Sequence, residues 1–132
     1  MEVFELTLQA FFSEMKKWND AMYSQFIKGT LTTEKEENGK LELISLMSKF
    51  CTEKNVKTVS LHYTDPSEYD VNTQIIERYE ILTKNKVVIY VQQLNRFKNK
   101  YKYTLFFKNG NWLIDKKEWF MKSKNKWTKC DL

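Results

Sequence analysis

The hydrophobic pattern changes period once along this chain of 132 residues, and that change restricts the fold more than any other feature. Between residues 8 and 26, large apolar side chains recur at spacings of four, three, four and four residues, which places them on one face of a helix. This stripe comprises Phe11, Met15, Trp18, Met22 and Phe26. Gly29 follows it, and glycine is common just past the C-terminus of a helix. We therefore expect a first helix that packs through this stripe and ends before Gly29.

A second helix is expected after or within a polar segment at residues 33–40, which is either a connection or the frayed start of that helix. Thr33 and Glu36 have the spacing of a capping box. The residues expected on the buried side of the helix are Leu43, Leu46, Met47 and Phe50. Cys51, near the end of the helix, is predicted to be a small core residue rather than a nucleophile.

Strand patterns follow the single proline, Pro66. The expected strands are residues 73–82, 86–94, 101–107, 111–120 and 126–132. Asn109 and Gly110 form the dipeptide that supplies the positive φ angles of a tight hairpin turn. Residues 86–94 are apolar on both faces, which is typical of a central strand covered on both sides.

Helices followed by an antiparallel meander predict an α+β domain, with the helices gathered on one face of a curved sheet. Residues 1–132 are expected to form a single domain. Residues 1–53 would be mainly helical, residues 54–72 would cross over, and residues 73–132 would form the antiparallel sheet. Such a layout leaves a concave, aromatic-lined cavity at one end, which is a common place for a ligand or catalytic group.

The chemistry available to the chain is limited, because it has one histidine, His62, and three glycines scattered singly. A multi-histidine metal site is excluded, and neither a Gly-rich phosphate loop nor a G-x-S-x-G motif is present. Proton transfer by a buried acid remains open, with Asp115 as the strand-borne candidate and Asp65, Asp70 and His62 as candidates in the crossover. A structural role is the commoner explanation for each of these residues alone. We therefore expect no catalytic residue, no metal and no cofactor.

The stretch SLHYTDPSEYDV, residues 60–71, contains both the histidine and the proline. Pro66 would fix a turn there, and Asp70 could accept hydrogen bonds from backbone N–H groups. We expect Tyr69 and Asp70 to hold the crossover at the rim of the cavity, while His62 takes no part.

The formal net charge of +5 raises the question of nucleic-acid binding. The positive charge is nearly all lysine, since only Arg78 and Arg96 are arginines, whereas bases and phosphates are best recognised by the planar guanidinium group. The densest basic stretches are residues 96–102 and 122–129. We expect no nucleic-acid partner, and a basic nucleic-acid-associated domain is kept as a third hypothesis.

The first residues lack the basic and apolar regions of a signal peptide, and no stretch approaches the roughly 18 apolar residues of a membrane span. Cys51 and Cys130 lie far apart and match no metal spacing, which favours free thiols in a reducing compartment. We expect a cytoplasmic protein with no membrane partner.

Five segments in succession carry a resemblance to a known family. They are MKKW, SKFCTEK, SLHYTDPSEYDV, VVIYVQQ and YKYTLFFKNGNWLIDKKEWF, followed by a last tryptophan, Trp127. This succession, from about Met15 to Trp127, resembles the NTF2-fold immunity proteins of bacterial polymorphic toxin systems. The combination carries the resemblance, because Gly-x-Trp-x-Ile-Asp alone occurs across the wider NTF2-like superfamily, which includes isomerase-like and dehydratase-like enzymes.

The resemblance implies an NTF2-like cone, with N-terminal helices packed on a curved antiparallel sheet, that binds a cognate toxin and neutralises it without catalysis. Signature or cavity residues would be Tyr63, Pro66, Tyr69, Asp70, Trp112 and Asp115. Because complementary potentials favour association, the basic charge favours a toxin with an acidic face, or one that is not a nuclease.

Aromatic residues dominate binding hot spots, and the strand ends and the long turn are expected to expose them. The candidates for the toxin interface are therefore Phe97, Lys98, Lys100, Trp119, Phe120 and Trp127. The alternative is a small-molecule enzyme or ligand binder of the isomerase or dehydratase type, which requires an acid with a raised pKa facing the cone cavity. The protein would be a monomer or a homodimer, and Phe106 would help pairing through the outer face of the sheet.

Overall fold

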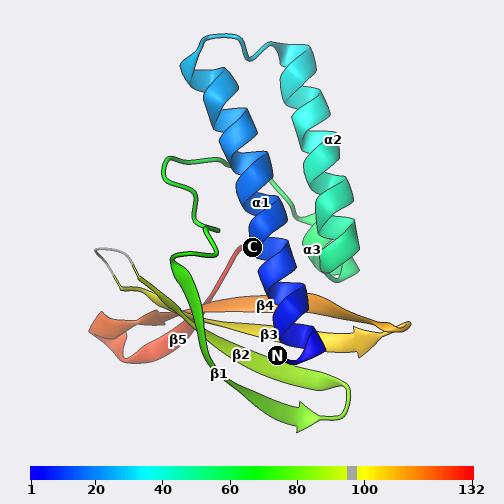
Figure 1. Cartoon of the computed structure of the whole chain (residues 1–132), viewed down its shortest axis with the longest axis vertical. Coiled ribbons are helices and arrows are strands. Elements are labelled where there is room, and N and C mark those ends of the chain that lie inside the picture. Colours follow the sequence, from blue (N-terminus) through cyan, green and yellow to red (C-terminus); the bar gives the residue numbers. More distant parts are fainter. Residues whose placement is uncertain (95–97) are drawn as a thin grey trace.

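Three helices precede five strands in the described part of the chain, residues 1–94 and 98–132 of this computed structural model (Figure 1). The helices are α1 (Val3–Ile27), α2 (Thr33–Phe50) and α3 (Glu53–Lys57). The strands are β1 (Gln74–Thr83), β2 (Lys86–Gln93), β3 (Lys100–Lys108), β4 (Asn111–Met121) and β5 (Lys126–Cys130), and a short 3-10 helix, η1 (Lys122–Lys124), precedes β5. Within the described residues, no helix is both long and apolar enough to cross a bilayer.

Helix α1 buries most of the stripe that the sequence predicts. The first four residues of the stripe are buried, whereas the fifth, Phe26, is 57% exposed, so its assignment to the buried face is wrong. Each four-residue step carries a side chain about 40° past a full turn, and successive steps rotate Phe26 away from the core. Its ring instead contacts that of Tyr63 in the crossover, at 6.1 Å between centroids.

Helix α1 ends as expected at Gly29, which has a φ of 69°. The N–H of Gly29 donates to the carbonyl of Phe26 at 3.2 Å, and the N–H of Thr30 donates to that of Gln25 at 3.0 Å. These two bonds make a Schellman motif, and they satisfy carbonyls that the last turn would otherwise leave unpaired.

Helix α2 begins one residue before the position that the sequence predicts. Its N-cap is Thr32, whose Oγ1 accepts a hydrogen bond from the N–H of Lys35 at 3.2 Å. The predicted capping box of Thr33 and Glu36 is therefore wrong, because both residues already lie inside the helix. The polar segment 33–40 belongs to α2 and is not a connection.

The strands form one antiparallel sheet in the order β1-β2-β3-β4-β5, so that strands adjacent in sequence are adjacent in space. Asn109 and Gly110 have φ angles of 53° and 82°, which confirms the tight turn expected between β3 and β4. In β2, the three side chains that face the helices, Val87, Ile89 and Val91, are buried, and those between them are half-buried. This confirms β2 as a central strand.

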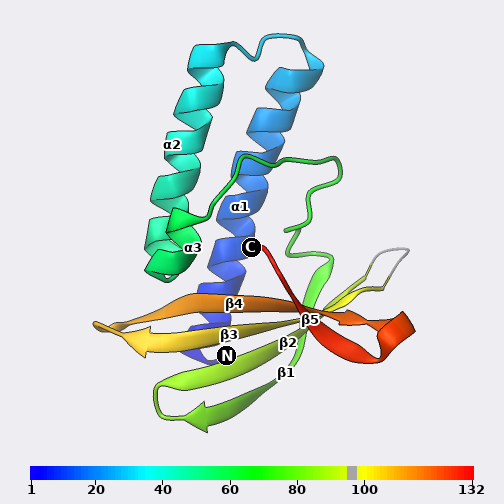
Figure 2. The same cartoon turned by 180° about the vertical axis from the view of Figure 1, so that it is seen from behind.

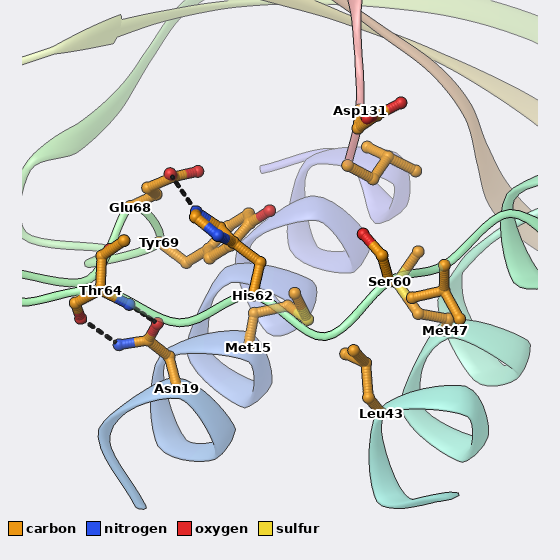
Figure 3. Close-up of a pocket in the computed structure, with 12 residues that line it drawn as sticks. Met15, Asn19, Leu43, Met47, Ser60, His62, Thr64, Glu68, Tyr69 and Asp131 are labelled. Carbon is orange, nitrogen blue, oxygen red and sulfur yellow. Dashed lines mark hydrogen bonds and ion pairs between the residues drawn. The ribbon is translucent and has the colours of Figure 1, made fainter. Parts of the chain in front are cut away.

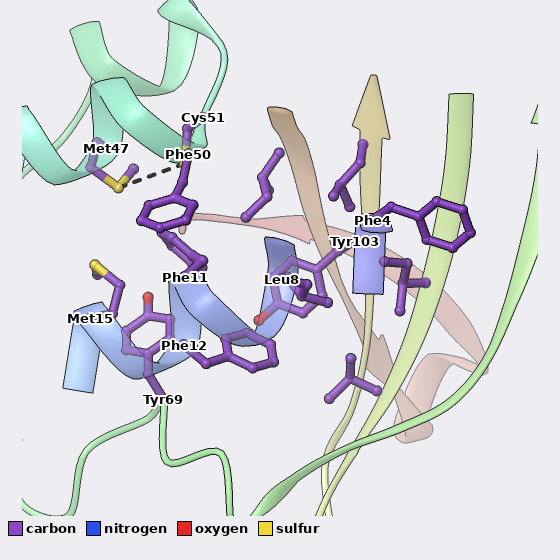
Figure 4. Packing of buried hydrophobic residues seen from close by; sticks show 14 of the residues in the cluster. Phe4, Leu8, Phe11, Phe12, Met15, Met47, Phe50, Cys51, Tyr69 and Tyr103 are labelled. Atoms are coloured by element: carbon purple, nitrogen blue, oxygen red, sulfur yellow. Dashed lines mark hydrogen bonds between the residues drawn. The ribbon is translucent and has the colours of Figure 1, made fainter. Parts of the chain in front are cut away.

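The helices lie on one face of the curved sheet (Figures 1 and 2). The N-terminal end of α1 rests against the sheet, and its far end stands away from the sheet beside α2. Figure 4 shows the core where these layers meet: the Phe12 ring lies 5.5 Å from that of Tyr103 in β3, and the Phe11 ring lies 5.8 Å from that of Phe50 in α2. The predicted α+β layout is confirmed.

Candidate functional site

The first candidate site is a pocket under the crossover between α3 and β1, with a volume of about 350 Å³ (Figure 3). We call it the crossover pocket. Its apolar wall is formed by Met15, Leu43, Met47, Val59 and Leu132. Its polar wall is formed by Asn19, Ser60, His62, Thr64, Glu68, Tyr69 and Asp131. The pocket therefore joins α1, α2, the crossover and the last described residues.

Asn19 fastens the crossover to α1. Its Nδ2 donates to the carbonyl of Thr64, its Oδ1 accepts from the N–H of Thr64, and both distances are 2.8 Å. The side chain is only 4% exposed. Sequence reasoning missed this residue, although a signal existed: Asn19 follows Met15 by four residues and so carries a polar amide onto the buried face.

Tyr69 forms one side of the crossover pocket, and Figure 3 shows its ring beside His62. The Tyr69 ring is buried and lies 5.8 Å from that of Phe11 and 6.4 Å from that of Phe12. Burial raises the pKa of the Tyr69 phenol, so at neutral pH the hydroxyl is a neutral donor. His62 is 67% exposed at its side chain, and its Nε2 lies 3.5 Å from Oε1 of Glu68.

The remaining signature residues of the crossover shape the chain and lie outside this pocket. Asp70 accepts the N–H of Asn72 at its Oδ1, at 2.9 Å, and so sets the turn into β1. The carbonyl of Pro66 accepts from Oγ1 of Thr64 at 3.0 Å. Tyr63 packs against α1, where its ring lies 6.3 Å from that of Trp18.

Asp115 holds the end of α2 and the start of α3 against β4. Its carboxylate accepts from Oγ1 of Thr52 and from Nζ of Lys54, both at 2.9 Å, and its carbonyl accepts from Nδ2 of Asn55 at 2.9 Å. In the pairing of β3 with β4, Asp115 is the residue without a partner, which marks a β-bulge. None of the described pockets is lined by Asp115.

Trp112, the signature residue still to be placed, is the second residue of β4 and lies next to the β3–β4 turn. Its ring contacts those of Phe4 and Phe107, at 5.3 and 5.4 Å. The residues of the sequence signature therefore do not form one site: Tyr69 lines the crossover pocket, and Tyr63, Trp112 and Asp115 lie elsewhere.

The described candidate interface residues gather at one end of the sheet, where the start of β3 pairs with the far end of β4 and the β4–β5 hairpin follows. We call this region the basic–aromatic end. Its residues are Lys98, Lys100, Trp119, Phe120, Lys122, Lys124, Lys126 and Trp127. Phe97, which the sequence also predicts for the interface, lies outside the described residues. The fold thus brings together two stretches that are about 20 residues apart in the sequence.

The aromatic residues of this end are half-buried, because they pack on one another. The rings of Phe120 and Trp127 are 5.2 Å apart, and Tyr90 of β2 lies 5.9 Å from Trp127. The ammonium group of Lys102 lies 4.8 Å from the centre of the Trp127 ring. This is cation–π geometry, and it gives the outer face of the sheet a mixed aromatic and basic surface.

The charge is strongly segregated along the chain. Residues 84–132, from the β1–β2 turn onward, contain 13 lysines and arginines and three acidic residues. Residues 1–83 contain nine lysines and arginines and 14 acidic residues. The net charge of +5 therefore conceals an acidic part, which comprises the helices, the crossover and β1, and a strongly basic part, which comprises β2 to β5.

No group of three or more His, Cys, Asp or Glu side chains in residues 1–94 and 98–132 is placed to hold a metal ion. Cys51 and Cys130 are both free thiols, and Cys51 is buried as expected. The carboxylates proposed as acids have structural partners, Asp115 with Thr52 and Lys54 and Asp70 with the turn into β1.

Comparison with known proteins gives two matches. The family model described as NTF2 fold immunity protein matches residues 3–131. Immunity protein RhsIA of Dickeya dadantii (strain 3937) is 37% identical over 131 residues, which are 97% of this chain and 95% of the relative. No solved structure matches.

Proposed function

The chain belongs to the family of NTF2-fold immunity proteins, and from this premise we propose that it neutralises a cognate bacterial toxin by direct contact and without catalysis. The observation that carries the proposal is the basic–aromatic end, where the rings of Phe120 and Trp127 pack together beside several lysines of β3, η1 and β5. Aromatic side chains supply most of the energy in protein interfaces, and lysines at the rim steer a partner of opposite charge.

The proposed partner surface is acidic. Since residues 84–132 carry 13 basic and three acidic residues, the sheet attracts negative charge more strongly than the net charge of +5 indicates. Binding there would cover the active site or the substrate path of the toxin.

We propose the cytoplasm as the compartment, where Cys51 and Cys130 would stay reduced.

The proposed absence of catalysis is supported by the hydrogen bonds that the two candidate acids, Asp115 and Asp70, already make. A general acid or base must face a cavity that admits a substrate. Asp115 is instead held by Thr52 and Lys54, and the carboxylate of Asp70 accepts the backbone N–H of Asn72 in its own turn. Both carboxylates are thereby used to position the backbone.

A test of toxin binding would combine protection and affinity measurements. The charge-reversed triple variant Lys122→Glu, Lys124→Glu and Lys126→Glu alters the basic–aromatic end. A triple variant with the same change in charge, Lys28→Glu, Lys35→Glu and Lys40→Glu, alters the far end of α1 and α2. We expect the first variant to lose protection of cells that express the toxin and the second to retain it.

Equal protection by both variants would place the interface elsewhere. Failure of the wild-type protein to bind or protect against the toxin encoded beside its gene would overturn the proposed function itself. A DNA or RNA retention assay at low salt tests the third hypothesis, a basic nucleic-acid-associated domain. Binding of nucleic acid through lysines is strongest at low salt and weakens steeply as salt is added.

The crossover pocket supports a second candidate function, the binding of a small molecule. The observation in its favour is a volume of about 350 Å³ with hydroxyl, amide and carboxylate groups along one wall and methionines and leucines along the other. A thermal-shift screen of small polar compounds, repeated on the Ser60→Leu variant to fill the pocket, would test it. A compound that raises the melting temperature of both proteins equally would not be bound in this pocket.

A further inference from the structure

Lys117 is a buried lysine on the face of β4 that looks toward the helices. It pairs across the sheet with Tyr103 of β3 and Cys130 of β5, and it is only 6% exposed. It lines a second pocket, of about 460 Å³, next to the basic–aromatic end. We call this the sheet-end pocket, and its other residues used below are Glu68, Gln93, Tyr101, Trp119 and Asp131.

The ammonium group of Lys117 has aromatic neighbours but no counter-ion in the described part of the chain. Its Nζ lies 4.6 Å from the ring centre of Tyr101, 5.5 Å from that of Tyr69 and 5.9 Å from that of Tyr103. No salt bridge or hydrogen bond of this side chain occurs among residues 1–94 and 98–132. Burial lowers the pKa of Lys117, as expected where water is removed from an ammonium group.

Two buried side-chain oxygens on the strands around this pocket have no hydrogen-bond partner among the described residues. They are Oε1 of Gln74 and Oγ1 of Thr128. Gln74 is paired across the sheet with Gln93, and Thr128 is paired with Trp119, so both lie on the strand face that lines the sheet-end pocket. Natural proteins rarely leave such groups unpaired, and ordered water, a ligand or a partner satisfies them.

We propose that Lys117 receives one carboxylate side chain of the toxin, which enters the sheet-end pocket from the basic–aromatic end. This inference rests on the proposed function and specifies the chemistry at the centre of the interface. A buried ammonium group without a counter-ion favours an acceptor that carries negative charge. Tyr101 and Trp119 would flank the entering side chain, and the lysines of the basic–aromatic end would attract it from a distance.

The charges around Lys117 favour a single carboxylate over a phosphate. The titratable groups that face it are Glu68 and Asp131 at the pocket, Cys130 on β5, and the phenols of Tyr69, Tyr101 and Tyr103. Glu68 is drawn toward the crossover by His62, at 3.5 Å, but it still contributes negative potential together with Asp131. A doubly charged group would be repelled more strongly than a singly charged one.

The test compares two adjacent lysines that point to opposite faces of β4. Lys117→Met removes the buried ammonium group and keeps an apolar chain of similar length. Lys116→Met is the matched control, because Lys116 is half-exposed and pairs with Glu118 at 3.4 Å on the outer face. We expect Lys117→Met to weaken toxin binding by about 30-fold or more, and Lys116→Met to weaken it by less than about threefold.

A second measurement remains informative if Lys117→Met alters the fold. The wild-type protein, labelled with ¹³C at the lysine side chains, would be titrated by NMR alone and in complex with the toxin. A carboxylate against Lys117 raises its pKa on binding, whereas coverage by apolar surface lowers it further. A raised pKa supports the proposal, and an unchanged or lowered pKa overturns it.

The outcomes separate this inference from the proposed function. If the wild-type protein does not bind the toxin, the proposed function fails. If it binds, and the two methionine variants bind equally well, only the assignment of Lys117 fails. Acetate is the probe for a free small carboxylate: if acetate raises the pKa of Lys117 and the toxin does not, the pocket serves a small molecule and the proposal is overturned.

Discussion

Asn19 and Thr64 are joined by two hydrogen bonds of 2.8 Å, one in each direction, although 45 residues separate them in the sequence. The carboxamide of Asn19 thus pairs with the Thr64 backbone as a neighbouring strand would. It holds the middle of an irregular crossover against the middle of α1. Asn19 and Thr64 both line the crossover pocket, so these two bonds fix part of its polar wall.

Replacing Asn19 with alanine should therefore destabilise the whole domain. The variant leaves a carbonyl and an N–H of Thr64 unpaired in a poorly solvated place, and we expect a loss of about 3 kcal/mol in the free energy of unfolding. Urea denaturation followed by circular dichroism would measure it. Lys17→Ala, which removes an exposed 3.4 Å ion pair on the same helix, should change stability by less than about 0.5 kcal/mol. Equal losses from both variants would contradict a fastening role.

Two substitutions at Tyr69 separate the contribution of its ring to stability from that of its hydroxyl. The ring packs between Phe11 and Phe12, so Tyr69→Ala should cost about 4 kcal/mol through the cavity that it leaves. The hydroxyl makes no hydrogen bond to the described residues, so Tyr69→Phe should lie within about 0.5 kcal/mol of the wild type. Thermal and urea unfolding of both variants would decide. A large cost of Tyr69→Phe would show that the hydroxyl is bonded to water or to a ligand in the crossover pocket.

Asp115 is predicted to matter for stability and not for toxin neutralisation. Asp115→Ala removes the acceptor for Thr52 and Lys54 and should cost about 1–2 kcal/mol, a value reduced because the Lys54 side chain is largely exposed. Asp115→Asn keeps one acceptor oxygen and should cost less. Protection against the toxin should persist in Asp115→Asn, and its loss in a fully folded variant would revive the enzymatic alternative.

The two cysteines should differ in reactivity. Burial raises the pKa of Cys51 to about 12, so at pH 8 the thiol of Cys51 is almost entirely protonated and unreactive. Cys130 is only half-buried, although burial raises its pKa as well. A colorimetric thiol reagent at pH 8 should therefore modify Cys130 first, and the folded Cys130→Ser variant should be nearly inert. Both thiols should react once the wild-type protein is unfolded in urea.

Local patterns in the sequence predicted the regular elements, because each depends on a short stretch of chain. A tight two-residue hairpin turn needs positive φ angles, which asparagine and glycine adopt easily, and Asn109 and Gly110 supply them here. Gly29 likewise takes a positive φ where α1 ends. The sites were harder to predict, since they depend on contacts between distant segments. A single extra residue in β4, Asp115, changes the strand face of everything beyond it, and this shift carries Lys117 toward the helices.

The contact of Asn19 with Thr64 was hidden for a related reason. The path of the crossover has no periodicity, so no pattern in residues 58–73 indicates which backbone group meets α1. The position of the described interface candidates has a simpler origin. An antiparallel meander places the β2–β3 and β4–β5 connections at the same end of the sheet. From the sequence these residues were expected only to be exposed, at strand ends and in a long turn, and the partial burial of the aromatic ones comes from ring packing that only the structure defines.

Salt should slow the association of the protein with its toxin. The sheet carries most of the positive charge, and attraction between opposite surfaces raises the association rate more than it lowers the dissociation rate. Between about 50 and 500 mM salt, where the screening length falls from roughly 14 to 4 Å, we expect the association rate constant to fall about tenfold and the dissociation rate constant to change less than threefold. Surface plasmon resonance at several salt concentrations would measure both.

The charge-reversed variant of Lys122, Lys124 and Lys126 tests directly whether these lysines cause the salt dependence of association. If these lysines attract the toxin, the variant should associate slowly at low salt and show a flattened or inverted dependence on salt. The variant of Lys28, Lys35 and Lys40 has the same net charge and should keep the salt dependence of the wild type. Identical behaviour of the two variants would mean that net charge alone steers the encounter and that the basic–aromatic end has no special part in it.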